Sequence, residues 1–327
     1  MKRFFLIIVT TVFLFTSCAQ QNNEKILSGT YFGQTPPGLT PELFAPDFIS
    51  SGLYVRDAAF TPDGKEFYFT LRGNNITSIV TTKMVDGKWT PLEVAQFSGL
   101  YKDVEPFINY DGSKFYFVSN RPINGENLDG KNTNIWVMDR IDNEWSEPYP
   151  IGEPINGHGM VFFPTVAKSG NLYFTRRGAN DYEAIYRSKF VDGKYMEPQK
   201  LPANVNTTDA QFNSFISPDE DFLIIPVYGR DDSYGETDYY VTFRDENDNW
   251  SDVINLGNVV NTKASEYSPS LTPDGKYFVY QSNEGAIPAF EKRHTYSEIV
   301  ELLSGPKNGS SNLYWVSAEV IHKLKPY

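Results

Sequence analysis

The sequence predicts an all-β chain folded as a single β-propeller of five four-stranded blades. Three observations predict this fold: a hairpin motif that recurs five times, a second mark at a constant distance from it, and an N-terminal segment that supplies the one missing strand. The composition agrees, because 15% aromatic and 21% charged residues are typical of a packed chain and not of a disordered one.

The first mark is a hairpin: an apolar strand, a tight turn, and a strand of the Phe-Tyr-Phe type. Asp-Gly between two alternating strands is a strong short-range signal for a hairpin. The five copies place their turns at Asp63, Asp111, Ser169, Asp219 and Asp274.

The second mark is an apolar residue followed by Ser or Asn, and the polar residue stands 13 positions before each turn. A third mark, a hairpin that ends in an aromatic residue, follows four of the five copies. Each repeat therefore holds four strands, a to d, which is typical of a propeller blade. An antiparallel sandwich would also explain many short strands, but it would not keep three marks in phase. The polar residues of the second mark are Ser50, Ser98, Asn156, Asn206 and Asn261.

The last repeat ends after its third strand, within residues 311–321. Residues 39–50 align with residues 89–98 of the first repeat, so we expect the N-terminal segment to form strand d of the last blade. Such a strand closes the ring and covers an exposed edge. A six-bladed ring is the alternative, but a sixth blade would need about 40 more residues, and the segment before Pro41 is too short to supply them.

The first residues of the chain resemble a targeting signal. Lys2 and Arg3 precede an apolar run over residues 4–15, which is too short to span a bilayer comfortably. This run and the small residues before Cys18 resemble a bacterial lipoprotein signal peptide, and the resemblance implies cleavage before Cys18 and its lipidation. An ordinary secretory signal is the alternative. We expect a signal peptide over 1–17, a tether over 18–30, and a propeller domain over 31–327 with an insertion at 285–311, held on a membrane of the cell envelope.

The repeats resemble the WD-like propeller repeats of the TolB type over residues 39–320, through the Pro-Asp-Gly-Lys turn, the strand after it, and the Ile-Asn or Val-Asn mark. That resemblance implies the fold and a periplasmic or lipid-anchored bacterial protein. It leaves the function open, since such repeats serve scaffolds, receptors and some enzymes.

Charge and composition exclude several functions. The net charge is −12, and removal of Lys2 and Arg3 with the leader makes it −14, so we expect no nucleic-acid partner. A single cysteine excludes a multi-cysteine zinc site, and three histidines leave little room for histidine ligands. We expect no cofactor and no metal.

The candidate site lies on the face where strand a begins, which we call the upper face. Asp57, Glu105 and Asn213 stand six residues before their turns, and an arginine follows strand b in four of the five repeats. Carboxylates and arginine forks at one channel mouth would bind an anionic or sugar-like ligand. Alternatively, each arginine ties its loop to a neighbouring blade. The other candidate residues are Arg72, Arg121, Arg177, Arg230 and Glu266.

The insertion at 285–311 contains a predicted helix over residues 295–303. Thr295 and Glu298 form a capping box, and Tyr296, Ile299, Val300 and Leu303 share one face. A lid over the channel mouth and a plain packing role are both open.

Three functional hypotheses follow. The first is a lipid-anchored module that binds an envelope protein or a glycan without catalysis. The second is a carbohydrate-active enzyme, a lyase or glycosidase, that uses the upper-face carboxylates. The third is a subunit of an envelope assembly.

Overall fold

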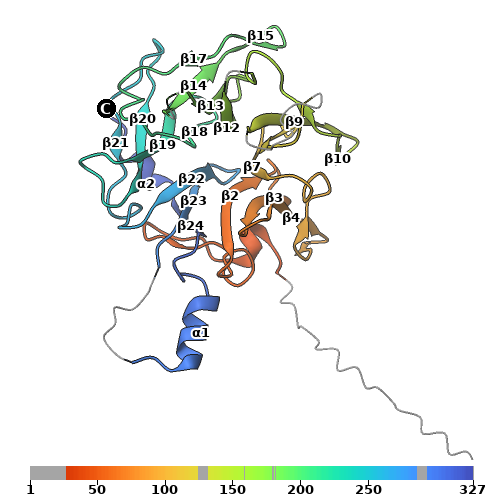
Figure 1. The fold of residues 1–327 in the computed structure, drawn as a ribbon, viewed down its shortest axis with the longest axis vertical. Coiled ribbons are helices and arrows are strands. Elements are labelled where there is room, and N and C mark those ends of the chain that lie inside the picture. Colours follow the sequence, from red (N-terminus) through yellow and green to blue (C-terminus); the bar gives the residue numbers. More distant parts are fainter. Residues whose placement is uncertain are drawn as a thin grey trace, which may run out of the picture.

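The computed structural model describes residues 27–123, 132–157, 159–178, 180, 182–285 and 293–326, so the predicted leader and Cys18 lie outside the described residues. Five antiparallel sheets stand around a central axis, which is the predicted five-bladed propeller (Figure 1). Within each blade, hairpins join strands a, b and c in chain order, and a short strand d pairs with the outer side of c.

Blades 1 and 2 have the same plan. Blade 1 contains β2 (Tyr54–Phe60), β3 (Glu66–Arg72), β4 (Thr77–Val85), β5 (Lys88–Trp89) and β6 (Glu93–Val94). Blade 2 contains β7 (Asp103–Ile108), β8 (Lys114–Ser119), β9 (Asn134–Ile141), β10 (Glu144–Trp145) and β11 (Tyr149–Pro150).

The other three blades repeat that plan. Blade 3 contains β12 (Met160–Val166), β13 (Leu172–Arg177), β14 (Glu183–Ser188) and β17 (Gln199–Lys200), with a hairpin of β15 (Phe190–Val191) and β16 (Lys194–Tyr195). Blade 4 contains β18 (Phe215–Ile216), β19 (Phe222–Tyr228), β20 (Thr237–Phe243) and β21 (Ile254–Asn255). Blade 5 contains β22 (Glu266–Leu271), β23 (Tyr277–Ser282), β24 (Asn312–Ser317) and, from the N-terminus, β1 (Glu42–Leu43).

The ring closes through β1, as the sequence predicts. Glu42 lies opposite Trp315 and Leu43 opposite Tyr314, and the Phe44 main-chain N–H donates to the Leu313 carbonyl oxygen over 2.8 Å. Strand β6 pairs with β4 of blade 1 in the same antiparallel sense.

The polar mark of each repeat has a structural role. The Asn156 carboxamide accepts a hydrogen bond from the Ile135 N–H and donates one to the Ile135 carbonyl oxygen, each over 3.0 Å. Asn206 makes the same pair with Ile185, and Asn261 with Tyr239. Each of these Asn side chains thus makes the pair of hydrogen bonds that a neighbouring strand would make with strand c. This role explains why the Asn recurs at a constant distance from the turn of each repeat.

Apolar side chains from neighbouring blades fill the spaces between the sheets. The seam between blades 5 and 1 is the most aromatic: Phe44 and Trp315 are fully buried there, and Phe32 lies 4.3 Å from Trp89 between ring centroids. The aromatic residues are therefore mainly inter-blade packing.

The residues that the structure describes also include three short helical segments: the 3₁₀ helix η1 (Thr30–Gly33), α1 (Tyr296–Ser304) and α2 (Glu319–His322). Helix α1 begins with the predicted capping box of Thr295 and Glu298. It stands outside the ring in the view along the short axis of the molecule, so it does not cover the channel and the lid hypothesis is wrong (Figure 1).

Candidate functional site

The waist of the channel is a ring of five equivalent residues, one from each strand a or its start. All five are buried and have positive φ angles between 50° and 65°. In four blades the strand pairing shifts at this point, which is a β-bulge. The backbone is therefore strained at all five positions. This conformation directs the Asp57 and Glu105 side chains to the next blade. The ring consists of Asp57, Glu105, Phe163, Asn213 and Ser268.

Arg56 joins the two carboxylates of this ring. Its Nε donates to Asp57 Oδ1 and its Nη2 to Glu105 Oε1, each over 2.8 Å. The remaining oxygens accept from main-chain groups of the next blade: Asp57 Oδ2 from the Glu105 N–H over 3.3 Å, and Glu105 Oε2 from the Phe163 N–H over 2.7 Å. Every carboxylate oxygen of the pair therefore has a protein donor.

The two carboxylates are buried. Burial raises the pKa of Glu105 to about 7, although Arg56 opposes the shift and the Asp57 charge adds to it. The pKa of the Arg56 guanidinium lies above its ordinary value, because attraction to Asp57 and Glu105 exceeds its own burial cost. Near neutral pH this cluster can hold or release one proton.

The candidate arginines do not reach the waist. Arg121 Nη2 donates to Asp103 Oδ1 over 2.8 Å, Arg230 Nε donates to Asp232 Oδ1 over 2.9 Å, and Arg177 forms an ion pair with Glu183. The Arg72 guanidinium lies 5.5 Å from the centre of the Tyr54 ring. Within the described residues, the ion pairs of Asp57 and Glu105 come from Arg56 alone, which the sequence analysis did not single out. A charged residue inside the apolar strand Tyr54–Phe60 was the available signal.

Glu266 joins the segment before β22 to the end of β23 by hydrogen bonds. Its Oε1 accepts hydrogen bonds from the Thr262 hydroxyl over 2.6 Å and the Ser282 hydroxyl over 2.7 Å, and burial raises its pKa. Asp103, at the same position of blade 2, accepts from Ser98 over 2.9 Å. The structure brings Asp57, Glu105 and Asn213 into one ring and leaves Glu266 and the four arginines out of it. Arg121 Nη2 also donates to the Phe97 carbonyl oxygen, in the connection between blades 1 and 2, over 3.0 Å.

The residue before each ring position is partly buried, and several of these side chains contact one another across blades. Arg56 is the only charged member of this set among the described residues, and its guanidinium lies 5.0 Å from the centre of the Tyr267 ring. The other four are Val104, Phe162, Phe212 and Tyr267.

The opposite end of the channel, the lower mouth, opens into a cavity of about 400 Å³ that the sequence analysis did not predict. This volume falls within the range of small-ligand sites, about 300 to 1,000 Å³. All five blades contribute, mainly through their a–b turns, which the sequence showed only as fold marks. The lining includes Phe60, Pro62, Phe107, Tyr110, Lys168, Phe215, Pro218, Leu271 and Pro273.

Polar groups around the lower mouth already have partners. The Tyr110 hydroxyl donates to the Ile216 carbonyl oxygen over 3.3 Å, Thr272 donates to Asp274 over 2.7 Å, and Lys168 donates to Asp219 over 3.0 Å. Burial also raises the pKa of Tyr110, so its phenol stays neutral. The lining is therefore mixed: aromatic rings and turn prolines alternate with polar side chains such as Asn109, Ser270 and Asp274.

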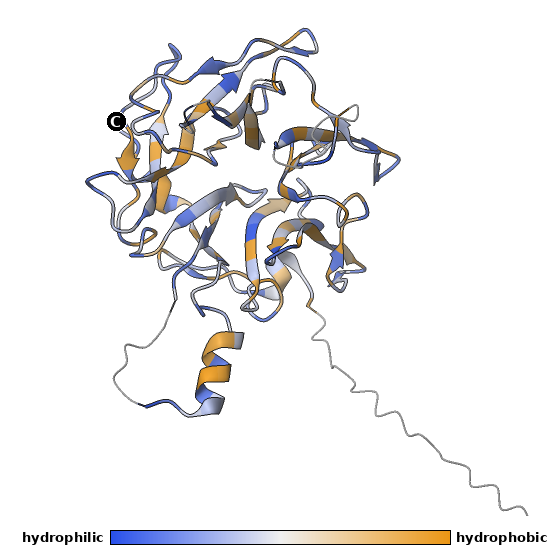
Figure 2. Ribbon diagram, viewed as in Figure 1, coloured by the Kyte–Doolittle hydropathy of each residue, from blue (hydrophilic) through white to orange (hydrophobic). Residues whose placement is uncertain are grey.

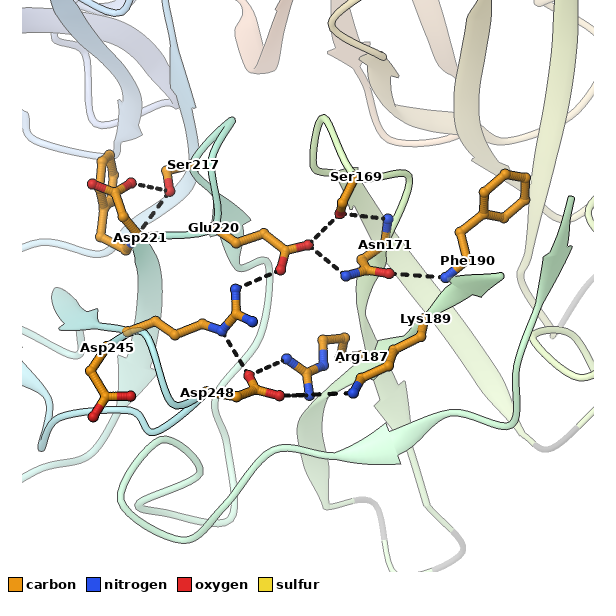
Figure 3. Close-up of polar contacts among 12 residues, drawn as sticks. Ser169, Asn171, Arg187, Lys189, Phe190, Ser217, Glu220, Asp221, Asp245 and Asp248 are labelled. Atoms are coloured by element: carbon orange, nitrogen blue, oxygen red, sulfur yellow. Dashed lines mark hydrogen bonds and ion pairs between the residues drawn. The ribbon is translucent and has the colours of Figure 1, made fainter. Parts of the chain in front are cut away.

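A polar network joins blades 3 and 4 beside the a–b turns (Figure 3). Glu220, buried with a φ of 59°, accepts from Ser169 over 2.6 Å and from Arg244 over 2.7 Å. Asp248 lies between Arg244 and Arg187 at 2.7 and 2.6 Å, and hydrogen bonds from Arg187 hold its pKa well below its usual range. This network links two blades and presents no unpaired carboxylate.

Among the described residues, no group of three or more His, Cys, Asp or Glu side chains is placed to hold a metal ion. None of the helices described is long and apolar enough to cross a membrane.

Comparisons with known proteins add similarities of fold. No protein-family model matches the chain, and no curated protein matches its sequence. TolB from Acinetobacter baumannii superposes with a TM-score of 0.47 and 19% identity, over 71% of this chain and only 50% of that one. A TolB-type protein from Agrobacterium tumefaciens gives 0.48 and 11%, over 81% and 90%. An arabinanase from Bacillus subtilis gives 0.49 and 13%, over 82% and 95%. Because all three scores lie below 0.5, nothing about function follows from these names.

Proposed function

We propose that the chain is a non-catalytic binding module of the bacterial cell envelope, anchored through a lipid at Cys18, and that it binds a segment of another protein at the lower mouth of its channel. The observation that carries this proposal is the cavity to which all five blades contribute, with aromatic rings and prolines among its lining residues.

The lining of the cavity favours a protein over a glycan. A sugar ligand needs polar groups with free hydrogen-bonding capacity, but the Tyr110, Thr272 and Lys168 side chains are engaged with their own blades. Aromatic rings and prolines instead suit one or two apolar side chains of a partner. A permanent partner at this surface would make the chain a subunit of an envelope assembly.

Site-specific photo-crosslinking in living cells tests the proposal. A photoreactive phenylalanine analogue is placed at Leu271, in the lower mouth, and for comparison at the exposed Tyr228 at the end of β19. We expect a discrete protein adduct from position 271 alone, which Phe107→Glu in the same chain removes. Adducts from both positions in equal amounts, or none from position 271, would contradict the proposal.

One observation favours a carbohydrate-active enzyme as the second candidate: the Glu105 carboxyl has a pKa raised to about 7 and lies beside Asp57. Catalytic acids of glycosidases have raised pKa values. Against this, Arg56 and main-chain N–H groups already occupy the carboxylate oxygens.

Turnover of a panel of dye-linked polysaccharides separates the two candidates. We expect no release of dye by the unmodified chain. Dye release that both Asp57→Asn and Glu105→Gln abolish, with the folded state retained, would support the enzyme instead.

A further inference from the structure

Helix α1 presents an apolar face that no other described part of the chain buries. The exposed fraction is 83% for Tyr296, 43% for Ile299 and Val300, and 66% for Leu303, and no residue of the helix is buried. Glu298 and Glu301 lie on the opposite face of the helix. Figure 2 shows the hydrophobic residues of α1 in orange, outside the ring.

The structure fixes the C-terminal end of this helix to blade 1. Asn308 Nδ2 donates to the carbonyl oxygens of Gly52 and Leu303, each over 2.9 Å. Gly52 has a φ of 88°, and a Cβ atom there would lie 2.5 Å from the Ser304 carbonyl oxygen, so this approach requires glycine. Leu53, next to this contact, is 58% exposed and extends the apolar surface.

The described chain begins at the same side of the ring. The Gly29 N–H donates to the Gly87 carbonyl oxygen over 3.1 Å, and Trp89 Nε1 donates to the Gly29 carbonyl oxygen over 2.9 Å, which holds the chain start on the outer hairpin of blade 1. In Figure 1, the start of the described chain and α1 both leave the ring at the bottom of the view. Cys18 precedes Leu27, the first described residue, by a segment that can reach at most about 30 Å.

We propose that α1 lies in the interfacial layer of the membrane that holds the lipid anchor, so that the rim of the propeller faces the bilayer. This inference rests on the proposed anchor at Cys18, which brings this rim within reach of the membrane. An amphipathic helix in this layer buries its apolar face near the acyl chains and leaves its polar face in water.

Charge determines which kind of membrane contact is possible. The span of α1 holds two glutamates and no Lys or Arg, and the described basic residues beside it, Arg293 and Lys307, lie outside the helix, so the helix itself has no attraction to anionic headgroups. Burial of Tyr296, Ile299, Val300 and Leu303 is the remaining driving force. Binding through α1 therefore persists at high salt and on uncharged phosphatidylcholine vesicles.

The single cysteine makes a direct test possible. Once lipid occupies Cys18, a cysteine introduced elsewhere is the only free thiol and takes a nitroxide label. The lipidated chain is reconstituted in phosphatidylcholine vesicles as Leu303→Cys, as Glu301→Cys on the polar face of the same helix, and as Leu100→Cys, an exposed site in the connection between blades 1 and 2.

Collision of the label with oxygen, which concentrates in lipid, is compared with collision with a water-soluble nickel chelate. We expect the oxygen-to-nickel ratio at position 303 to be at least threefold that at positions 301 and 100. Equal ratios at 303 and 301 would overturn the inference. Protection of position 303 from both reagents would also overturn it, because that result indicates a protein partner or a second copy on the helix.

The proposed anchor is checked separately, by the mass of the protein before and after Cys18→Ser. If Cys18 carries no lipid, the anchor fails, and the same three labelled chains are added to vesicles without it. Equal ratios at 303 and 301 in that arrangement overturn the role of α1 as well, whereas the binding site at the lower mouth is unaffected by either result.

Discussion

The Glu105 carboxylate in blade 2 accepts a hydrogen bond from the main-chain N–H of Phe163 in blade 3, over 2.7 Å. Asp57 makes the corresponding contact from blade 1 to the N–H of Glu105. Two acidic residues of the repeat thus link three successive blades at the waist ring, and the pKa of Glu105 lies near neutral pH.

Replacement of Glu105 should change how stability depends on pH. The pKa of Glu105 rises from 4.5 to about 7 in the folded chain, so the folded state binds more protons than the unfolded state between these values. The contribution of this group to the free energy of unfolding is therefore largest below about pH 4.5 and falls as the pH rises to about 7. We expect Glu105→Gln to flatten the difference in urea midpoint between pH 5 and pH 8, whereas Glu93→Gln, at an exposed position, keeps it. An unchanged pH dependence in Glu105→Gln would contradict the assignment.

Asn156→Ala should destabilise the ring. The substitution removes the acceptor of the buried Ile135 N–H, while the Ile135 carbonyl oxygen keeps its hydrogen bond from the Ile151 N–H, and an unsatisfied buried polar group costs about 1 to 3 kcal/mol. We expect a loss of about 2 kcal/mol or more in the free energy of unfolding, measured in urea. Gln199→Ala, at an exposed position of β17, is the control and should change it by less than about 0.5 kcal/mol. Equal effects of the two substitutions would show that the Asn mark does not bridge strand c.

Phe44→Ala should weaken the closure of the ring. Phe44 is fully buried and packs edge-on against Phe32 and Trp315, at 5.6 and 5.3 Å between ring centroids. Removal of a buried phenylalanine side chain costs about 3 to 5 kcal/mol. We expect a lower thermal midpoint and faster proteolysis next to β1, while Leu39→Ala, at an exposed site of the same segment, leaves both unchanged. A cut pattern spread evenly over the blades would argue against a local opening at this seam.

Asp248→Asn should remove part of the acid sensitivity of the protein. Hydrogen bonds from Arg187 and Arg244 lower the pKa of Asp248, so this carboxylate stabilises the folded chain above its unfolded pKa of about 3.9, and that stability is lost as the pH falls below it. The side chain is 34% exposed, so we expect the substitution to cost only about 1 kcal/mol at pH 7. The difference from the unmodified chain should vanish near pH 2. Asp231→Asn, at an exposed position, is the matched control, and a cost that persists at pH 2 would point to packing instead of charge.

The sequence could predict the blade count, the turns, the strand from the N-terminus and the cap of α1. Each of these features depends on a short local motif or on the repeat of the sequence. The turn position of Asp63 and the polar position of Asn156 occur in every repeat at a constant separation, and Thr295 stands three residues before Glu298. Local rules and repetition are the two kinds of signal that one sequence carries without a structure.

The site could be predicted only in part. The waist ring was found, since Asp57 and Glu105 share a repeat position, but Arg56 occurs once and has no repeat to reveal it. The cavity at the lower mouth was missed because Phe107, Tyr110 and Leu271 meet only when five turns from distant parts of the chain converge. The direction of α1 depends on the contact between Gly52 and Ser304, which lie far apart in the sequence.

The seam between β1 and β24 also governs how the molecule is made. The Ser50 hydroxyl that donates to the Leu313 carbonyl oxygen is 263 residues away from it in the chain, whereas each hairpin of a blade joins near neighbours. Contacts of such long sequence separation form late, because the loop entropy must be lost before they form. During synthesis, β1 therefore has no partner until β24 has been made, and β24 is an open edge that attracts other strands until the two pair. Removal of β1 would open this one seam and leave the edge of blade 5 exposed to self-association, while the other four blades stay complete.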